Sequence, residues 1–371
     1  MTTSVILAGG GSGGHLSPGL AVAERLHSLS PETPVHFACS DRPIDRLMLE
    51  SAGASFTPIR STPFSIRPVG LVRFVRGLAR GTRESAEVLR SHQAGVVLAL
   101  GGFVSAPVVR AARSLGIPAF LLNLDVVPGR ANRWVAGRAQ RVYTALPLGA
   151  GQVLPNLAGQ VDFPIRRAAI APADPATCRE RLGLAPEKPT LLVTGASQGA
   201  SSLNQLMIRF VAERPGALEG WQVLHLSGPA DRSALEDAYR TAGIDSVVLE
   251  FIDQMGLAWG AAELAVSRAG ANSVAEVALN RIPAIFAPYP WHKDLHQEHN
   301  ARPLVEVGSA RLERDLVDPD ENLSTIGRAL RELLLDPEAR NRMRDASGAL
   351  PSSDGASQVA ELLLSALARG A

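Results

Sequence analysis

Short runs of β-branched and aliphatic residues alternate with helix-length stretches along nearly the whole chain of 371 residues. This alternation is typical of parallel sheets whose strands are joined by helices. The pattern passes once through the first half of the chain and restarts near residue 190. We therefore predict two α/β domains, each a Rossmann-like, doubly wound parallel sheet. The expected strands are residues 4–8, 35–38, 96–100, 119–122 and 141–144, followed by 190–194, 222–226, 247–250, 263–266 and 284–286.

The predicted division between the two sheets lies in a Pro- and Ala-rich stretch, residues 155–189, with a linker near 160–170. The length of the chain exceeds the usual size of one domain, which also favours two. We expect domains at residues 1–164 and 165–355, followed by a C-terminal helix at 356–371. That last segment is amphipathic and can pack back on the first domain.

The composition is that of an ordinary globular protein, with 46% hydrophobic and 20% charged residues. The two cysteines, Cys39 and Cys178, form no CxxC pattern, so neither a disulfide framework nor a structural zinc site is expected. The N-terminus has no basic leader, and no run of about 18 apolar residues could span a bilayer. These features predict a cytoplasmic or peripheral protein.

The formal net charge of +1 hides a strong asymmetry between the two halves. Residues 1–160 contain 16 Arg, no Lys and 8 acidic residues, whereas the rest of the chain contains 21 basic and 28 acidic residues. A basic first half indicates an anionic partner. Because no nucleic-acid-binding motif is present and aromatic residues are only 5%, we expect a membrane surface or a phosphorylated ligand rather than nucleic acid.

The first expected strand runs directly into a glycine-rich loop at residues 9–14. Such a strand-to-helix turn lets the backbone approach a ligand and directs amide groups at negative charge. Gly9, Gly11 and Gly14 fit the dinucleotide pattern GxGxxG, and Asp41 is a loose match for its acidic partner. An NAD-dependent oxidoreductase is therefore one alternative, and a loop for another ligand is the other.

His15 follows the glycines at the carboxyl end of the first strand, where open α/β sheets bind ligands. An imidazole there can accept a proton near neutral pH, although it could also cap its own helix. The second half opens with a similar loop at residues 195–200, which includes Ser197. This loop lacks the Lys-Ser/Thr pair of a P-loop, but it can hold a diphosphate at a helix N-terminus without a metal.

At this point the chain resembles glycosyltransferase family 28, and in particular its inverting peptidoglycan N-acetylglucosaminyltransferases, which have the GT-B fold. The first loop is similar to the family's GGTGGHxxPG motif, with Ser12 where threonine is usual. A second loop is similar to GGYVSGP, with Phe103 replacing tyrosine, and a third to GGSQGA, with Ala196 for glycine. The remaining similar motifs are residues 250–253, 268–276 and 292–301.

This resemblance implies a donor site for UDP-N-acetylglucosamine in the second domain. Phe251 and Ile252 would lie on the uracil, although core packing is the alternative explanation for this pair. Glu276 would accept hydrogen bonds from the ribose, unless it is a solvated surface charge. The other implied substrate-binding residues are Ser197, Gln198 and Arg268 with Arg166 nearby for the diphosphate, His296 and Gln297 for the sugar hydroxyls, and Ser12, Gly13, Gly14 and Asn123 in the first domain.

The chain departs from the family at residues 122–125, where His-Glu-Gln-Asn is usual and Leu-Asn-Leu-Asp is present. Asn123 stands at the usual glutamate position, and Asp125 is a new carboxylate. We expect His15 to be the catalytic base, with Asp125 as an orienting group or a substitute. Because this segment belongs to the acceptor side, a related GT-B enzyme with another lipid or small-molecule acceptor is an alternative.

Residues 67–83 alternate arginines with apolar residues. Leu71, Phe74, Val75 and Leu78 fall on one helical face, the pattern of an interfacial helix attracted to anionic lipid, in which each basic residue contributes about 1 kcal/mol. An ordinary helix that buries this face in the core is the alternative.

We predict transfer of N-acetylglucosamine from UDP-N-acetylglucosamine to the muramyl 4-hydroxyl of undecaprenyl-linked lipid I, which makes lipid II, by a peripheral protein at the cytoplasmic membrane face. The only DxD pattern, Asp318 and Asp320, lies in a Pro-containing turn, so we expect neither a metal nor a cofactor. An inactive membrane-binding relative is a third alternative.

Overall fold

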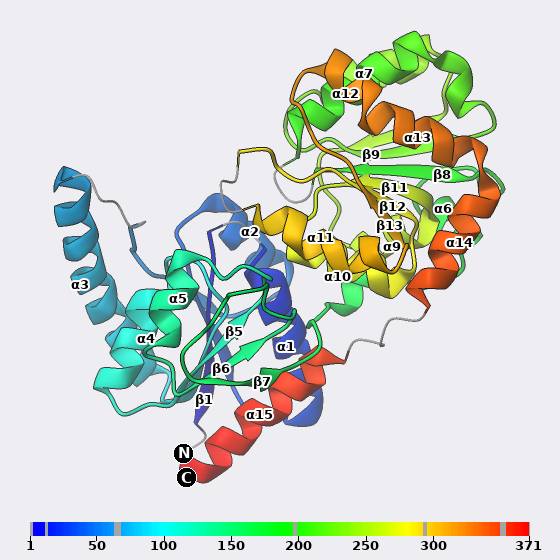
Figure 1. Cartoon of the computed structure of the whole chain (residues 1–371). Helices are drawn as coiled ribbons and strands as arrows, with labels where there is room; N and C mark the ends of the chain where they lie inside the picture. Colours follow the sequence, from blue (N-terminus) through cyan, green and yellow to red (C-terminus); the bar gives the residue numbers. More distant parts are fainter. Residues whose placement is uncertain are drawn as a thin grey trace. The chain divides into compact units, whose positions relative to one another are not determined.

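The chain divides into two compact units, which we describe separately. The computed structural model describes residues 3–11, 14–62, 68–195, 199–291, 295–348 and 354–370 (Figure 1). Unit 1 is Met1–Arg166 together with Ser353–Ala371, and unit 2 is Arg167–Ser352. The expected boundaries were 164/165 and 355/356, whereas the units divide at 166/167 and 352/353.

The centre of unit 1 is a parallel sheet, which has seven strands among the described residues, in the order β3-β2-β1-β4-β5-β6-β7. Leu7 on the central strand pairs with Phe37 on one side and with Leu98 on the other. The five inner strands are almost wholly buried because helices cover both faces of such a sheet. The strands are β1 (Ser4–Ala8), β2 (Val35–Cys39), β3 (Phe56–Pro58), β4 (Ala94–Ala99), β5 (Ala119–Asn123), β6 (Arg141–Thr144) and β7 (Leu157–Gln160).

Six helices accompany this sheet in the part of unit 1 that the structure describes. The last of them comes from the far end of the chain and packs on the first, where Leu363 and Val359 are buried. Arg25 donates a hydrogen bond to Ser357 across this contact (2.6 Å). The helices are α1 (Leu16–Leu29), α2 (Pro43–Ser51), α3 (Pro68–Ser91), α4 (Ser105–Ser114), α5 (Arg130–Ala136) and α15 (Gly355–Gly370).

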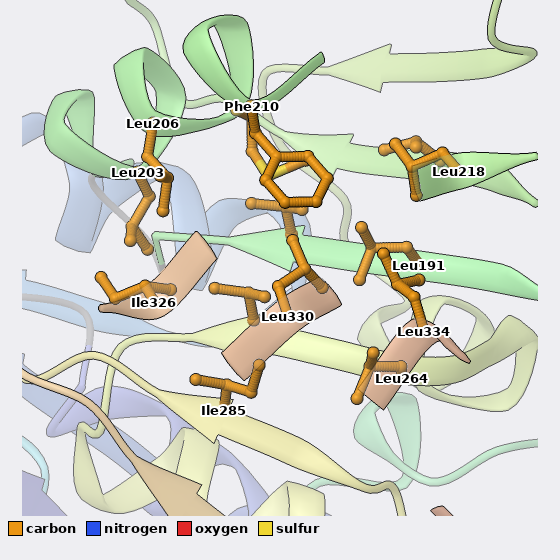
Figure 2. Close-up of a cluster of buried hydrophobic side chains, with 14 of the residues drawn as sticks. Leu191, Leu203, Leu206, Phe210, Leu218, Leu264, Ile285, Ile326, Leu330 and Leu334 are labelled. Carbon is orange, nitrogen blue, oxygen red and sulfur yellow. The ribbon is translucent and has the colours of Figure 1, made fainter. Parts of the chain in front are cut away.

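Unit 2 contains a second parallel sheet, which has six strands in its described part, in the order β10-β9-β8-β11-β12-β13. Figure 2 shows one side of its core, where α7 and α13 pack their apolar faces on the sheet. The strands are β8 (Thr190–Thr194), β9 (Gln222–Leu226), β10 (Ser246–Leu249), β11 (Ala262–Ser267), β12 (Ala284–Phe286) and β13 (Ala310–Leu312). The helices are α6 (Pro175–Arg181), α7 (Ser201–Glu213), α8 (Arg232–Thr241), α9 (Met255–Ala261), α10 (Ala271–Asn280), α11 (His296–Glu306), α12 (Pro319–Ser324), α13 (Ile326–Leu335) and α14 (Pro337–Ser347), with 3₁₀ turns η1 (Arg167–Ala169) and η3 (Pro215–Leu218).

The prediction of two doubly wound parallel sheets is confirmed. Three short strands were missed, namely β3, β7 and β13. Each has only three or four residues, and β7, which lies in the stretch expected to be a linker, is mostly exposed. Within the described segments, no helix combines the length and the hydropathy needed to cross a membrane.

Candidate active site

His15 lies between the first glycine loop and α1, at the carboxyl end of β1. It occupies the N-cap position of α1, but its side chain makes no capping hydrogen bond to that helix. The half-buried ring instead lies against the second glycine loop, because a Cβ on Gly101 would stand 2.8 Å from His15 Cδ2 and 3.0 Å from Nε2. The structure therefore does not support the alternative in which the His15 side chain caps α1.

The two glycine loops of unit 1 are in direct backbone contact. Gly101 and Gly102 have φ values of +109° and +78°, and a Cβ on Gly102 would stand 2.2 Å from the carbonyl oxygen of Gly10. Only glycine permits both this conformation and this approach. The buried hydroxyl of Ser105 joins the loops further, since it donates to the carbonyl of Ala8 (3.0 Å) and accepts from the amide of Gly101 (3.1 Å).

Two side-chain amides lead from the altered segment at 122–125 towards Gly101, the residue that borders the His15 ring. Asn123 is fully buried, and its Nδ2 donates to the backbone oxygen of Asp125 (2.6 Å). Its Oδ1 accepts from Nδ2 of Asn132 (3.0 Å). Asn132 Oδ1 in turn lies 2.9 Å from the position of a Cβ on Gly101, beside His15 Nε2. Asn132 was not predicted, because no motif in the sequence distinguishes it.

The residues expected to bind the nucleoside of the donor have different environments. Phe251 is 44% exposed, whereas Ile252 is half-buried against the core cluster of unit 2. Core packing thus explains Ile252 but not Phe251, which is available to stack on a planar ligand. Glu276 on α10 accepts a hydrogen bond from the indole of the buried Trp259 (2.9 Å). That contact orients the Glu276 carboxylate, so it is not a freely solvated surface charge.

Arg268 follows β11 and is nearly buried, in an ion pair with Asp315 (2.7 Å). Its guanidinium also donates to Ser202 Oγ (2.8 Å) and to the carbonyl of Ala287 (2.8 Å). We expected Arg268 to line the diphosphate side. In the structure these contacts tie together the ends of two strands and the first turn of α7, and the charge of Arg268 is neutralised by Asp315.

Asp315 has a pKa below the ordinary value for an aspartate. Burial would raise this pKa, but hydrogen bonds from Ser202 (2.6 Å) and Asn322 (2.7 Å) favour the charged carboxylate. The charge of Arg268 and the amide of Val317 act in the same direction and complete the lowering.

The remaining predicted residues are distributed over both units. Gln297, near the start of α11, accepts a hydrogen bond from the amide of Tyr289 (2.8 Å), and Arg268 lies over the ring of the same tyrosine. His296 is half-buried at the first position of α11. Arg166 belongs to unit 1, where it pairs with Glu24 of α1 (3.4 Å).

Some predicted residues lie outside the described part of the chain, namely Ser12, Gly13, Ser197 and Gln198. Gly14 is described and is half-buried. Among the described residues, no group of three or more His, Cys, Asp or Glu side chains could hold a metal ion.

Two parallel-sheet α/β units in one chain are the architecture of the GT-B fold. A crystal structure of MurG from Acinetobacter baumannii has the same fold, with a TM-score of 0.71 over 98% of this chain and 99% of that one at 24% identity. A glycosyltransferase of kitacinnamycin gives a TM-score of 0.68 over 99% and 100% of the two chains at 18% identity.

Two family models match the sequence. The glycosyltransferase family 28 N-terminal domain matches residues 5–144, and the family 28 C-terminal domain matches residues 190–359. The chain therefore belongs to glycosyltransferase family 28.

Curated relatives narrow the position of the chain within this family. A protein from Nocardioides sp. is 37% identical over 97% of both chains, and one from Anaeromyxobacter dehalogenans is 33% identical over 98% of this chain and 93% of that protein. Both are named UDP-N-acetylglucosamine--N-acetylmuramyl-(pentapeptide) pyrophosphoryl-undecaprenol N-acetylglucosamine transferase.

Proposed function

We propose that this enzyme transfers N-acetylglucosamine from UDP-N-acetylglucosamine to the muramyl 4-hydroxyl of undecaprenyl-linked lipid I, giving lipid II. The observation that carries the proposal is the likeness to relatives named for this reaction, which extends over almost the full length of both proteins. Similarity over both units matters because donor and acceptor sites of such an enzyme draw on different domains.

The proposed reaction inverts the sugar carbon, because the acceptor oxygen attacks it from the face opposite to UDP. His15 accepts the proton of the attacking hydroxyl, which is the step that general-base catalysis accelerates. The departing UDP accumulates negative charge. The amide groups of the loop before α7 and the N-terminal end of α7 stabilise this charge. Phe251 stacks on the uracil, and Glu276, oriented by Trp259, accepts from the ribose.

In unit 2, His296 and Gln297 contact the sugar hydroxyls, and Ser197 and Gln198 contact the diphosphate. Arg268 supports the diphosphate loop through Ser202. In unit 1, Ser12, Gly13 and Gly14 bind the acceptor. These assignments follow from the resemblance to the family's motifs, and each can be tested by mutagenesis.

The unusual segment at 122–125 does not by itself favour a different acceptor. Leu122, Asn123 and Leu124 are all buried, so three of the four exchanges affect the interior of unit 1. Only Asp125 is half-exposed. We propose that it orients the acceptor or His15, while Asn123 supports Asn132 from within the protein.

We also propose attachment to an anionic membrane surface through residues 67–83, on the cytoplasmic side. On α3, Val72 and Val75 are more than half exposed, and Arg73 and Arg76 are exposed beside them, whereas Phe74 and Leu78 are half-buried. The exposed valines and arginines form the combination that binds at a lipid interface. Arginines 60, 73, 76 and 80 also line a cavity of about 690 Å³ between α3 and the loop after β3, which suits phosphate groups.

The test is release of UDP from UDP-N-acetylglucosamine by the purified protein, with and without a lipid I analogue. Release that depends on the analogue supports donor, acceptor and reaction together. UDP binding without turnover on lipid I would overturn the acceptor assignment, and binding of NAD(H) in place of UDP would overturn the donor assignment.

A further inference from the structure

The backbone of Gly11 in the first glycine loop is held by two side chains at the start of α2, the N-cap residue Arg42 and Asp45 in the first turn. Its amide donates to Asp45 Oδ2 (2.8 Å), and its carbonyl oxygen accepts a hydrogen bond from the guanidinium of Arg42. Asp45 has no solvent exposure, and its Oδ2 also accepts from the hydroxyl of Ser40 (2.5 Å). Two side chains of opposite charge thus hold the two successive peptide groups that flank the Gly11 Cα.

This loop has a backbone that requires such support. Gly10 and Gly11 have φ values of +148° and +108°, which L-residues rarely adopt. Glycine also has more backbone freedom to lose than any other residue, so a glycine loop samples many conformations unless contacts select one. A Cβ on Gly10 would stand 2.3 Å from Asp45 Oδ2, so the carboxylate also lies tightly against the preceding residue.

The same contacts extend to the second glycine loop. The guanidinium of Arg42 lies over the ring of Phe103, 5.5 Å from its centroid, and a Cβ on Gly11 would stand 3.0 Å from the same ring. Gly101, two residues before Phe103, borders the His15 ring. From Arg42 and Asp45, contacts therefore lead towards His15 through Phe103 and Gly101 of the second glycine loop, although neither residue belongs to that loop.

We propose that Arg42 and Asp45 are positioning residues for the transferase reaction, which hold the two glycine loops in the geometry that lets His15 reach the acceptor hydroxyl. This inference rests on the proposed function. The two residues act through the backbone of Gly11 and the ring of Phe103 and do not contact the reacting atoms. Their loss slows the chemical step, whereas binding of the donor in unit 2 is unchanged.

The test compares Asp45→Ala, Asp45→Asn and Arg42→Gln in the full-length protein. Because displacement of a catalytic group by about 1 Å can slow a reaction about 10²-fold, we expect Asp45→Ala to lower kcat by about that factor with the KM for UDP-N-acetylglucosamine unchanged. Asp45→Asn keeps an acceptor oxygen for the Gly11 amide and should remain within about fivefold of wild type. The combination of Arg42→Gln with Asp45→Ala should lose little more than Asp45→Ala alone, since both side chains act on the backbone of one residue, Gly11.

Arg46 and Glu50 provide matched controls, because they form a surface ion pair on the same helix α2, with side chains 58% and 54% exposed. Arg46→Gln and Glu50→Gln should leave kcat unchanged. If Asp45→Ala fails to fold, Arg42→Gln carries the test, since Arg42 is an exposed residue. A kcat within twofold of wild type in a folded Asp45→Ala or Arg42→Gln protein would overturn the proposal, as would equal losses in the controls.

Hydrogen exchange separates this proposal from the proposed reaction. The Gly11 amide should be protected in wild type and should exchange faster in Asp45→Ala, whether or not the protein turns over lipid I. If the wild-type protein lacks transferase activity but the Gly11 amide still exchanges faster in Asp45→Ala, the role of Arg42 and Asp45 in the transferase reaction is overturned, whereas the contact between Asp45 and Gly11 stands. An amide that exchanges equally fast in both proteins would overturn the positioning contact itself.

Discussion

The buried ion pair between Arg268 and Asp315 gives a sharp stability prediction for unit 2. In Asp315→Asn the side chain keeps its shape but loses its charge, and the guanidinium of Arg268, with 7% side-chain exposure, stays buried without a counter-charge. Breaking one partner of a buried pair typically costs about 3–5 kcal/mol. We expect a loss of that size in the free energy of unfolding.

The geometry explains why asparagine cannot substitute. Each carboxylate oxygen of Asp315 accepts from two donors, one from Arg268 and Ser202, the other from Asn322 and the Val317 amide. An asparagine has one oxygen and one NH₂ group, so in either orientation its NH₂ faces two other donors. The loss of charge is therefore accompanied by two unsatisfied buried donors.

The assay is urea unfolding followed by tryptophan fluorescence. Unit 2 contains three of the four tryptophans, so the signal reports mainly on that unit. Asp320→Asn is the matched control, because Asp320 is 66% exposed in its ion pair with Arg209 and should contribute less than about 1 kcal/mol. A change below about 1 kcal/mol in Asp315→Asn would refute the reasoning.

The pH dependence provides a second readout of the same pair. The pKa of Asp315 is lowered in the folded state, so its stabilisation is complete above the unfolded value, about 3.9, and is lost as the pH falls through the lower folded value. Wild type should lose this contribution below about pH 4, and Asp315→Asn should lack that part of the acid transition.

Three further predictions concern catalysis, membrane binding and pH. His15→Ala should lower kcat at least about 10²-fold while the Kd for UDP, measured by calorimetry, stays constant; near-normal turnover would remove His15 from the base role. Arg73→Gln combined with Arg76→Gln should weaken sedimentation with anionic vesicles by about 30-fold, at about 1 kcal/mol per charge, and equal binding would contradict the membrane proposal. Burial lowers the pKa of His225 to about 3, so the unfolded chain binds a proton below about pH 6.5 that the folded protein does not. The free energy of unfolding should therefore decrease as the pH drops below about 6.5, by up to about 1.4 kcal/mol per pH unit. His225→Gln should flatten this slope in urea titrations, and an unchanged slope would contradict the prediction.

The sequence was sufficient for the inner strands, because their residues are buried on both faces and form continuous apolar runs. The bounds of β6, β8, β9 and β12 match the prediction. Three of the four edge strands in the described sheets, β3, β7 and β13, carry no such run and are recognised by their hydrogen bonds to a neighbouring strand. A prediction from the pattern of apolar side chains cannot detect a strand that lacks this pattern and is identified by backbone hydrogen bonds alone.

The residues of the candidate site also fall into those that the sequence could indicate and those that it could not. A strand, a glycine loop and a helix in succession indicated the loops and His15, because that signal is local. Asn132 and Asp45 reach the loops only through tertiary contacts, and nothing near them in the sequence indicates this. Arg268 shows the limit of a local signal in another way, because its motif indicated a ligand contact but could not indicate the ion pair with Asp315, which is distant in the sequence.

The return of α15 to unit 1 has a consequence for biosynthesis. The surface of α1 that α15 covers stays uncovered until the last residues of the chain have been made, whereas all of unit 2 precedes α15 in the sequence. A chain emerging from the ribosome can therefore complete its second unit before its first, the reverse of the usual N-terminal-first order. During that interval the surface of α1 that α15 later covers remains exposed to solvent.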